Sequence, residues 1–218
     1  MNNELMFSSI NQQWSTRWEC FEQIQDYVGY EFNLDPCAEP ETAKCKRFFT
    51  KEDDMFSKDL DWGFDAGQFA GGYWQSQVFC NPEYGRKQPL FVKENIRRIQ
   101  EGEVSDLTLL IPSRTETLLF HHTILPNASC ITFYEGRLVF GNDDYWEWFW
   151  SQEYLPDSKG GMKPNKKFGK VGSFNPAPFC SMVVEFNEES VLGLKDDLKH
   201  PKIATLKAPK FVYGYKKN

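Results

Sequence analysis

A short polar loop in the middle of the chain carries groups that suit chemistry on a planar amine. The apolar run over residues 78–80 has the length of a buried strand and stops at Asn81-Pro82-Glu83-Tyr84. Asn81 offers a side-chain carbonyl oxygen, and Pro82, which has no N–H, presents only a carbonyl. Tyr84 adds a flat aromatic face. Two acceptors beside a stacking surface suit the exocyclic amino group of a planar base, although an ordinary Asn-Pro turn explains the same residues.

The segments around this loop predict a strand, a tight loop and a helix. Polar residues follow the loop and lead into residues 90–99, where apolar residues repeat at helical spacing. Two more strand ends are predicted, because Leu34-Asp35 stops at Pro36 and the continuous apolar run 106–111 stops at Pro112. In an open α/β sheet such loops lie at the carboxyl edge of the strands, where ligands bind. The chain is therefore expected to present several ligand-bearing loops on one side of a sheet.

An acidic loop is expected at the same edge. Residues 48–50 predict a short strand, and Asp53 and Asp54 follow it in the loop 51–54. Carboxylates at the end of a strand can accept the hydroxyls of a ribose or hold an amino group. A solvated turn is the alternative for these two residues.

The remaining elements complete an α/β pattern. Ser15 or Thr16 is expected to cap a helix that ends at Gly29, and another helix is expected to begin at Leu118. Further segments are predicted as follows: strands over 129–133 and 179–186, an irregular insertion over 57–76, an aromatic-rich region with a basic loop over 143–170, and a tail without assigned structure from 198.

Composition predicts one globular domain over residues 1–218. Hydrophobic residues make up 40% and charged residues 26% of the 218 residues. No apolar run approaches the roughly 18 residues of a membrane span, and no signal peptide is evident, so a cytoplasmic protein is expected. The six cysteines are then expected to be free thiols. No Cys-x-x-Cys pair is present, so a metal site is not expected.

The charge is distributed unevenly. Residues 1–150 carry 13 Lys and Arg against 24 Asp and Glu, whereas residues 151–218 carry 12 against 7. The overall charge of −6 argues against nonspecific coating of a nucleic acid but leaves room for a local basic face. We therefore look for phosphate contacts in the last third of the chain, in a basic loop at about 157–172 and a basic tail from about 198. The lysines of that loop considered for phosphate contact are Lys159, Lys163, Lys166 and Lys167.

Taken together and in order, these segments resemble the phage-type DNA N6-adenine methyltransferases, the Dam-like enzymes. The resemblance covers roughly residues 14–186. The matching pieces are Trp14 to Phe21, Leu34 to Ala38, Ala43 to Cys45 with Phe48 to Asp54, Phe79 to Gly85, Leu110 to Thr117 with Phe120-His121, and Glu135 to Phe140.

The resemblance implies a Rossmann-like class I fold that depends on S-adenosylmethionine, with a mixed, mostly parallel sheet flanked by helices. Asp35, Pro36, Cys37 and Ala38 would stand where amino-methyltransferases carry their cofactor loop, with Asp53 or Asp54 beside them. The glycine signature that usually follows that loop is replaced by residues 39–41. The family's central loop has Pro where this chain has Glu83, whereas Asn81, Pro82 and Tyr84 are kept.

The implied activity is methyl transfer to N6 of adenine in double-stranded DNA. Asn81 and Pro82 would accept hydrogen bonds from the target amine, and Tyr84 would stack on the base once it is flipped out of the duplex. Arg114 would lie near that base. A monomer or weak dimer is expected.

Two alternatives stay open from the sequence. The same loop serves methylation of N4 of cytosine or of a glutamine amide, because each presents a planar amino group. A DNA-binding relative that has lost turnover through Glu83 is the other alternative.

Overall fold

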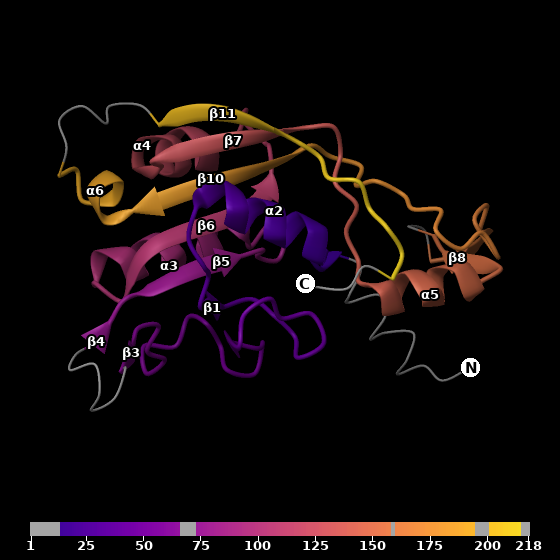
Figure 1. Cartoon of the computed structure of the whole chain (residues 1–218), viewed down its shortest axis with the longest axis horizontal. Helices are drawn as coiled ribbons and strands as arrows, with labels where there is room; N and C mark the ends of the chain where they lie inside the picture. The colour runs from indigo at the N-terminus through magenta and orange to yellow at the C-terminus, as the bar shows by residue number, and fades with distance from the viewer. Residues whose placement is uncertain (1–13, 66–72, 158–159, 195–200, 215–218) are drawn as a thin grey trace.

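The computed structural model describes residues 14–65, 73–157, 160–194 and 201–214 (Figure 1). In chain order the elements are α2 (Trp18–Val28), β1 (Leu34–Asp35), β2 (Arg47–Phe48), β3 (Phe64–Asp65), β4 (Tyr73–Trp74), β5 (Ser76–Cys80), α3 (Gln88–Gln100), β6 (Val104–Pro112), the π-helix η2 (Phe120–Ile124), α4 (Leu125–Asn127), β7 (Cys130–Glu135), α5 (Asp143–Ser151), β8 (Tyr154–Pro156), β9 (Met162–Pro164), β10 (Ser181–Asn187), α6 (Glu188–Val191) and β11 (Lys202–Lys207).

The main sheet joins seven of these strands in the order β11-β7-β10-β6-β5-β1-β2. Neighbouring strands are parallel except around β10, which runs antiparallel between β6 and β7. The chain passes from β1 to β2 on one side and later from β5 to β6 on the other, so the strand order reverses between β1 and β5. Open α/β sheets bind ligands outside the carboxyl ends of strands at such a reversal. The expected mixed α/β architecture with a mostly parallel sheet is confirmed.

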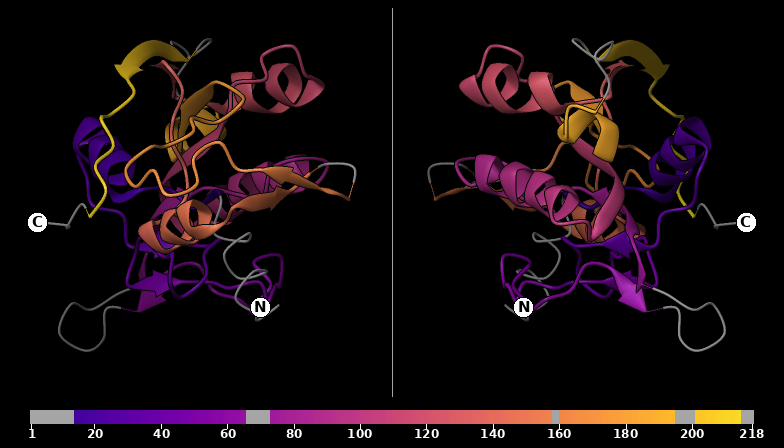
Figure 2. Two further views of the ribbon diagram at one scale, coloured as in Figure 1. Left: turned by 90° about the vertical axis from the view of Figure 1, so that its right-hand side faces the viewer. Right: turned by 90° about the vertical axis from the view of Figure 1, so that its left-hand side faces the viewer.

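Helices cover both faces of this sheet (Figure 2). Helix α2 covers one face, where its Phe21 and Ile24 are buried together with Phe79 of β5 and Leu110 of β6. Helices α3, η2 and α4 cover the other face. The sheet is therefore the middle layer of three, and its carboxyl edge is left for the loops.

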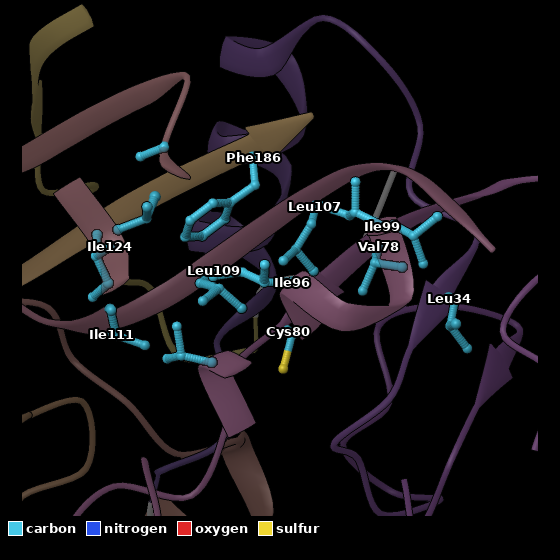
Figure 3. Packing of buried hydrophobic residues seen from close by; sticks show 14 of the residues in the cluster. Leu34, Val78, Cys80, Ile96, Ile99, Leu107, Leu109, Ile111, Ile124 and Phe186 are labelled. Carbon is cyan, nitrogen blue, oxygen red and sulfur yellow. The ribbon is translucent and has the colours of Figure 1, made fainter. Parts of the chain in front are cut away.

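Alternate residues of the central strands point to opposite faces, because side chains alternate along a strand. Val78 and Cys80 of β5 belong to the core beneath α3, where Figure 3 shows them with Leu107 and Leu109 of β6. Both strands are thus buried on two sides, which explains why apolar residues occupy both faces of each strand. A shift of one residue would exchange the two faces, so the packing fixes the register.

Helix α2 begins later than the sequence predicted. Its N-cap residue is Arg17, whose side chain makes no capping hydrogen bond, so the prediction of Ser15 or Thr16 as cap was wrong. The Thr16 hydroxyl instead contacts the side chain of Asn81. The end of the helix was predicted correctly, because Gly29 adopts the left-handed conformation with a φ of 82°.

Residues 142–174 form a lobe beyond the carboxyl ends of the parallel strands, which we call the α5 lobe (Figure 1). Asn142 caps α5 by accepting a hydrogen bond from the Tyr145 N–H at 3.0 Å. The helix buries four aromatic rings in a cluster of its own: Tyr145, Trp146, Phe149 and Trp150.

Two segments to which the sequence assigned no regular structure contain strands. The basic segment 157–172 includes β9, which pairs with β8 in a hairpin of the α5 lobe. The tail from 198 includes β11, which pairs in parallel with β7 and widens the main sheet. Both strands depend on a partner that local sequence does not reveal.

A buried guanidinium holds the irregular segment 55–62 against α3. The Arg98 side chain is 1% exposed and donates hydrogen bonds to three carbonyl oxygens of that segment at 2.6–3.2 Å. It also pairs with the carboxylates of Glu94 and Glu103 at 2.8 Å and lies 5.0 Å from the centre of the Trp62 ring. Arg98 therefore holds the first part of the predicted irregular insertion to α3, while Arg47 of β2 donates to the Asp61 and Trp62 carbonyls at the end of the segment.

The six cysteines are free thiols. In the part of the chain that the structure describes, no helix is both long enough and apolar enough to cross a membrane.

Candidate active site

Two of the predicted loops meet at the carboxyl ends of the neighbouring strands β1 and β5. The 35–38 loop follows β1 and the 81–85 loop follows β5. The Cys80 thiol donates a hydrogen bond to the Cys37 sulfur at 3.6 Å and so links the two strand ends. This contact and burial together raise the pKa of the Cys37 thiol well above its ordinary value, so the thiol stays protonated. The structure brings together the residues that the sequence had placed at one edge.

The side-chain amide of Asn81 is fixed at both ends. Its nitrogen donates hydrogen bonds to the Trp14 carbonyl at 2.8 Å and to the Thr16 hydroxyl at 3.1 Å. Its oxygen accepts a hydrogen bond from the Tyr84 hydroxyl at 2.7 Å. The Asn81 oxygen is therefore oriented toward Tyr84 as an acceptor.

The Tyr84 ring lies in a box of three aromatic rings drawn from distant segments. The centre of its ring lies 6.1 Å from that of Trp14, 6.2 Å from that of Phe140 and 5.4 Å from that of Phe179. Burial raises the pKa of the Tyr84 hydroxyl well above its ordinary value, so it stays a donor at neutral pH. The four aromatic rings form an apolar cluster directly beside the Asn81 oxygen.

The two residues between Asn81 and Tyr84 differ in exposure. Pro82 is buried, and no group in the described part of the chain donates a hydrogen bond to its carbonyl oxygen. Glu83 is exposed, so its carboxylate is hydrated rather than buried in the loop. Its charge lies near enough to Cys37 to contribute to the raised pKa of that thiol, after Cys80, burial and Asp35.

Asp35 lies beneath the 35–38 loop and holds its backbone. The residue is 4% exposed, and its carboxylate accepts hydrogen bonds from the Cys37 N–H at 3.4 Å and the Lys44 N–H at 3.1 Å. Burial raises the pKa of the carboxyl to about 6, although these N–H groups and the Lys44 charge oppose the shift. Asp35 therefore fixes the backbone of this loop through two hydrogen bonds.

We expect Asp35 to make stability depend on pH. Its pKa in the folded protein, about 6, lies above the ordinary value of 3.8, so its contribution is present below pH 3.8 and is lost as the pH rises through 6. Between pH 4 and 7 the wild type should lose on the order of 2–3 kcal/mol of unfolding free energy relative to Asp35→Asn. Urea unfolding of both proteins across this range measures the difference. Parallel curves would contradict the prediction.

The acidic loop after β2 is exposed and shaped by its own carboxylates. Asp53 accepts hydrogen bonds from the Thr50 N–H at 2.7 Å and the Thr50 hydroxyl at 2.9 Å, which lowers its pKa. Asp54 has a φ of 51° and accepts a hydrogen bond from the Phe56 N–H at 3.2 Å. Both carboxylates therefore form turns at the predicted edge.

Arg114 is exposed in the loop after β6 and lines a hollow of about 190 Å³. The hollow borders the site, because Gly85 at the end of the 81–85 loop lines it as well. The buried Gln88, at the start of α3, also lines it. Arg114 thus lies beside the end of the 81–85 loop, and its place near a target base stays a prediction.

The basic residues of the α5 lobe differ in their exposure and in their hydrogen bonds. Lys163 and Lys166 are exposed. The Lys167 ammonium donates a hydrogen bond to the Phe174 carbonyl, and burial, with Lys170 nearby, lowers its pKa. Lys159 lies outside the described residues.

Sequence reasoning missed the segment before α2. Trp14 and Thr16 hold the Asn81 amide, and Trp14 also contacts Phe140 and Phe179 at ring-centre distances of 5.9 and 5.4 Å. The available signal was a cluster of aromatic and hydrogen-bonding residues ahead of the helix, which helix capping seemed to explain.

Arg17 connects that segment to the α5 lobe. Its side chain is 3% exposed and donates hydrogen bonds to the Gly141 carbonyl, the Asp143 carboxylate and the Val212 carbonyl, each at 3.1 Å. Its guanidinium also lies 5.1 Å from the centre of the Phe174 ring. The candidate site and the lobe are therefore tied through adjacent residues of one segment.

The described residues contain no group of three or more His, Cys, Asp or Glu side chains placed to hold a metal ion. The polar groups of the site are instead carbonyl and hydroxyl oxygens beside aromatic rings.

The fold and the site define a mixed α/β protein whose candidate site, an Asn-Pro-x-Tyr loop, lies where the strand order of the sheet reverses. The chain belongs to the family described as DNA N-6-adenine-methyltransferase (Dam), which matches residues 5–160. The resemblance noted in the sequence is thereby confirmed at the level of the Dam family, and the family's description names DNA adenine methylation. No curated protein matches the chain.

Proposed function

We propose that the protein transfers a methyl group from S-adenosylmethionine to the N6 amino group of adenine in double-stranded DNA, on a Rossmann-like class I methyltransferase fold. The observation that carries the proposal is the pair of acceptors at the end of β5: the oriented Asn81 side-chain oxygen and the Pro82 carbonyl. Membership of the Dam family supports both the reaction and the substrate.

The two acceptors address the chemical difficulty of the reaction. The N6 amine is a poor nucleophile because its lone pair is delocalised into the ring. Hydrogen bonds from its two protons to Asn81 and Pro82 would draw the nitrogen toward tetrahedral geometry and localise the lone pair. Acceptors held in place in advance also stabilise the positive charge that develops on the nitrogen.

Tyr84 has two parts in this proposal. Its ring, beside the Asn81 oxygen, would stack on an extruded base, which a duplex would otherwise keep out of reach. Its hydroxyl currently satisfies the Asn81 oxygen at 2.7 Å. The target amine would replace that hydroxyl as donor, so an acceptor that is satisfied without substrate becomes available as the base enters.

The loops beside these acceptors fit the cofactor. The 35–38 loop adjoins the 81–85 loop through the Cys37–Cys80 contact, and the exposed carboxylates of Asp53 and Asp54 follow the adjacent strand β2, where they could accept hydrogen bonds from ribose hydroxyls. When bound, S-adenosylmethionine supplies an electrophilic methyl group. Asp35, held by backbone N–H groups, keeps the first loop in shape.

The α5 lobe is proposed to contact the DNA backbone. Replacing its four candidate lysines by alanine should weaken binding to every sequence alike and reduce the slope of log K against log[salt] by up to about 0.9 for each phosphate that is no longer neutralised. Fluorescence anisotropy with a labelled duplex at several salt concentrations measures this slope. The four lysines are Lys159, Lys163, Lys166 and Lys167.

A matched control removes two exposed lysines outside the lobe, Lys58 and Lys93. This control should leave the salt slope unchanged. An unchanged slope in the four-lysine variant would show that the four lysines are hydrated at the surface and do not contact phosphates.

The proposed function is tested by product analysis. The purified protein is incubated with S-adenosylmethionine carrying a labelled methyl group and with duplex DNA that lacks N6-methyladenine. The DNA is then digested to nucleosides and analysed by mass spectrometry. We expect labelled N6-methyl-2′-deoxyadenosine; labelled N4-methylcytosine, or no labelled nucleoside, would overturn the proposal.

A further inference from the structure

The two ends of the Asn81 amide face different kinds of partner. Its nitrogen lies 2.8 Å from the Trp14 carbonyl oxygen and 3.1 Å from the Thr16 hydroxyl oxygen, and its oxygen lies 2.7 Å from the Tyr84 hydroxyl. A backbone carbonyl accepts hydrogen bonds and cannot donate them, so only the NH2 end can face Trp14. The Thr16 hydroxyl oxygen then accepts a hydrogen bond from the second amide N–H.

The orientation matters because the ends of an amide have opposite chemistry. Rotated by half a turn, the Asn81 amide would offer N–H donors to the target amine, which is itself a donor. It would also bring its oxygen against the Trp14 carbonyl, where two acceptors repel. Only the observed orientation lets the side chain accept a hydrogen bond from the amine.

We propose that Thr16 is a positioning residue for methyl transfer, whose hydroxyl acts together with the Trp14 carbonyl to hold the Asn81 amide in the orientation that presents its oxygen to the target amine. This inference rests on the proposed function and deepens it. Thr16 acts through Asn81 and needs no contact with DNA or cofactor.

The position of Thr16 is itself well fixed. The residue is 4% exposed. The residue before it, Ser15, accepts a hydrogen bond from the Gly141 N–H at 2.8 Å, and the residue after it, Arg17, donates to the Gly141 carbonyl at 3.1 Å. The hydroxyl is therefore carried by a backbone held on both sides, which a side chain needs if it is to restrain another.

The test replaces Thr16 by Val, which keeps the shape of the side chain and removes the acceptor. We expect kcat for DNA methylation to fall about 3- to 10-fold, the loss that one ordinary hydrogen bond represents. KM for DNA and Kd for S-adenosylmethionine should stay unchanged. Thr16→Ser keeps the hydroxyl and should restore kcat. Thr16→Ala supplies the same deletion if the valine variant fails to fold.

A matched control separates positioning from general stability. Thr132 of β7 is also buried, and its hydroxyl donates a hydrogen bond to the hydroxyl of Tyr27 on α2 at 3.1 Å. Thr132→Val should lower the melting temperature without lowering kcat. A Thr16→Val variant that loses only stability, as this control does, would overturn the proposal.

A double-mutant cycle gives the decisive reading. If Thr16 acts through the amide, Thr16→Val should not lower kcat further once Asn81 is alanine. The same fold-loss with and without the amide would show a merely structural role and overturn the proposal. Wild-type protein that methylates no DNA would instead overturn the proposed function, and the positioning role with it.

Discussion

Asn81→Ala is expected to lower kcat for DNA methylation by a factor of about 10²–10³, the usual loss when one preorganised hydrogen-bonding group is removed from an active site. The substitution deletes the oxygen that accepts a hydrogen bond from the Tyr84 hydroxyl in the structure, while the Pro82 carbonyl remains. One acceptor cannot draw the lone pair of the amine out of the ring as two can. Incorporation of labelled methyl groups into DNA under single-turnover conditions measures the effect.

Two measurements accompany this variant. Calorimetry should give wild-type affinity for S-adenosylmethionine, because Asn81 is assigned to the target amine. Asn127→Ala is a matched control: its amide donates to the Thr123 carbonyl at 2.8 Å in α4, outside the site, and kcat should not change. An Asn81→Ala variant that methylates DNA at the wild-type rate would mean that the 81–85 loop is only a turn.

The sheet edge could be predicted because its signals are local. Apolar runs that end at Asp35-Pro36, Asn81-Pro82 and Pro112 mark strands that stop abruptly, and proline enforces the stop. Strand β6 runs over 104–112, slightly beyond its predicted bounds. Burial on both faces places apolar residues at neighbouring positions along such strands, so the strands can be recognised even where their ends cannot.

The order of the strands could not be predicted in the same way. The insertion of β10 between β6 and β7 depends on pairings such as Val183 with Leu110 and with Thr132, between segments more than fifty residues apart. Strand β11 is exposed along much of its length and is defined by its partner β7. Local patterns carry no information on which neighbour a strand chooses.

Helix α5 carries a signal in the sequence from which it could have been predicted, but it was not predicted. Asn142 followed by two acidic residues is a capping signal, and the structure uses it. The aromatic residues of the helix concealed its amphipathic pattern, because they line a cluster within the lobe and are not directed at the main sheet.

The loop that carries the chemical groups of the candidate site was predicted. The residues that hold this loop in place were not. Asn81, Pro82 and Tyr84 stand where the sequence placed them. The partners of Asn81 before α2, and the rings of Phe140 and Phe179, come from segments some sixty to a hundred residues away. Asp35 reaches the expected edge but turns its carboxylate under the loop, because two backbone N–H groups there need an acceptor.

Arg98→Met is expected to lower the free energy of unfolding by about 3–5 kcal/mol, the usual result of removing one partner from a buried ion pair. Methionine fills much of the space but leaves three carbonyl oxygens of the segment 55–62 without donors, and Glu103 without its cation. Urea unfolding monitored by tryptophan fluorescence measures the loss. We also expect weaker binding of S-adenosylmethionine, because Met55 of that segment contacts the Cys37 thiol at 3.2 Å.

Its neighbour on α3 provides the control. Arg97 pairs with Glu94 and Glu101, but its side chain is 31% exposed, so water replaces those contacts when it is removed. Arg97→Met should therefore cost less than about 1 kcal/mol. Equal losses in the two variants would contradict the argument, because they would mean that the contacts of Arg98 with segment 55–62 add nothing beyond a surface ion pair. A loss confined to Arg98→Met would show that this segment is held to α3 by one buried guanidinium, and weaker binding of S-adenosylmethionine by the same variant would show that the 35–38 loop depends on it.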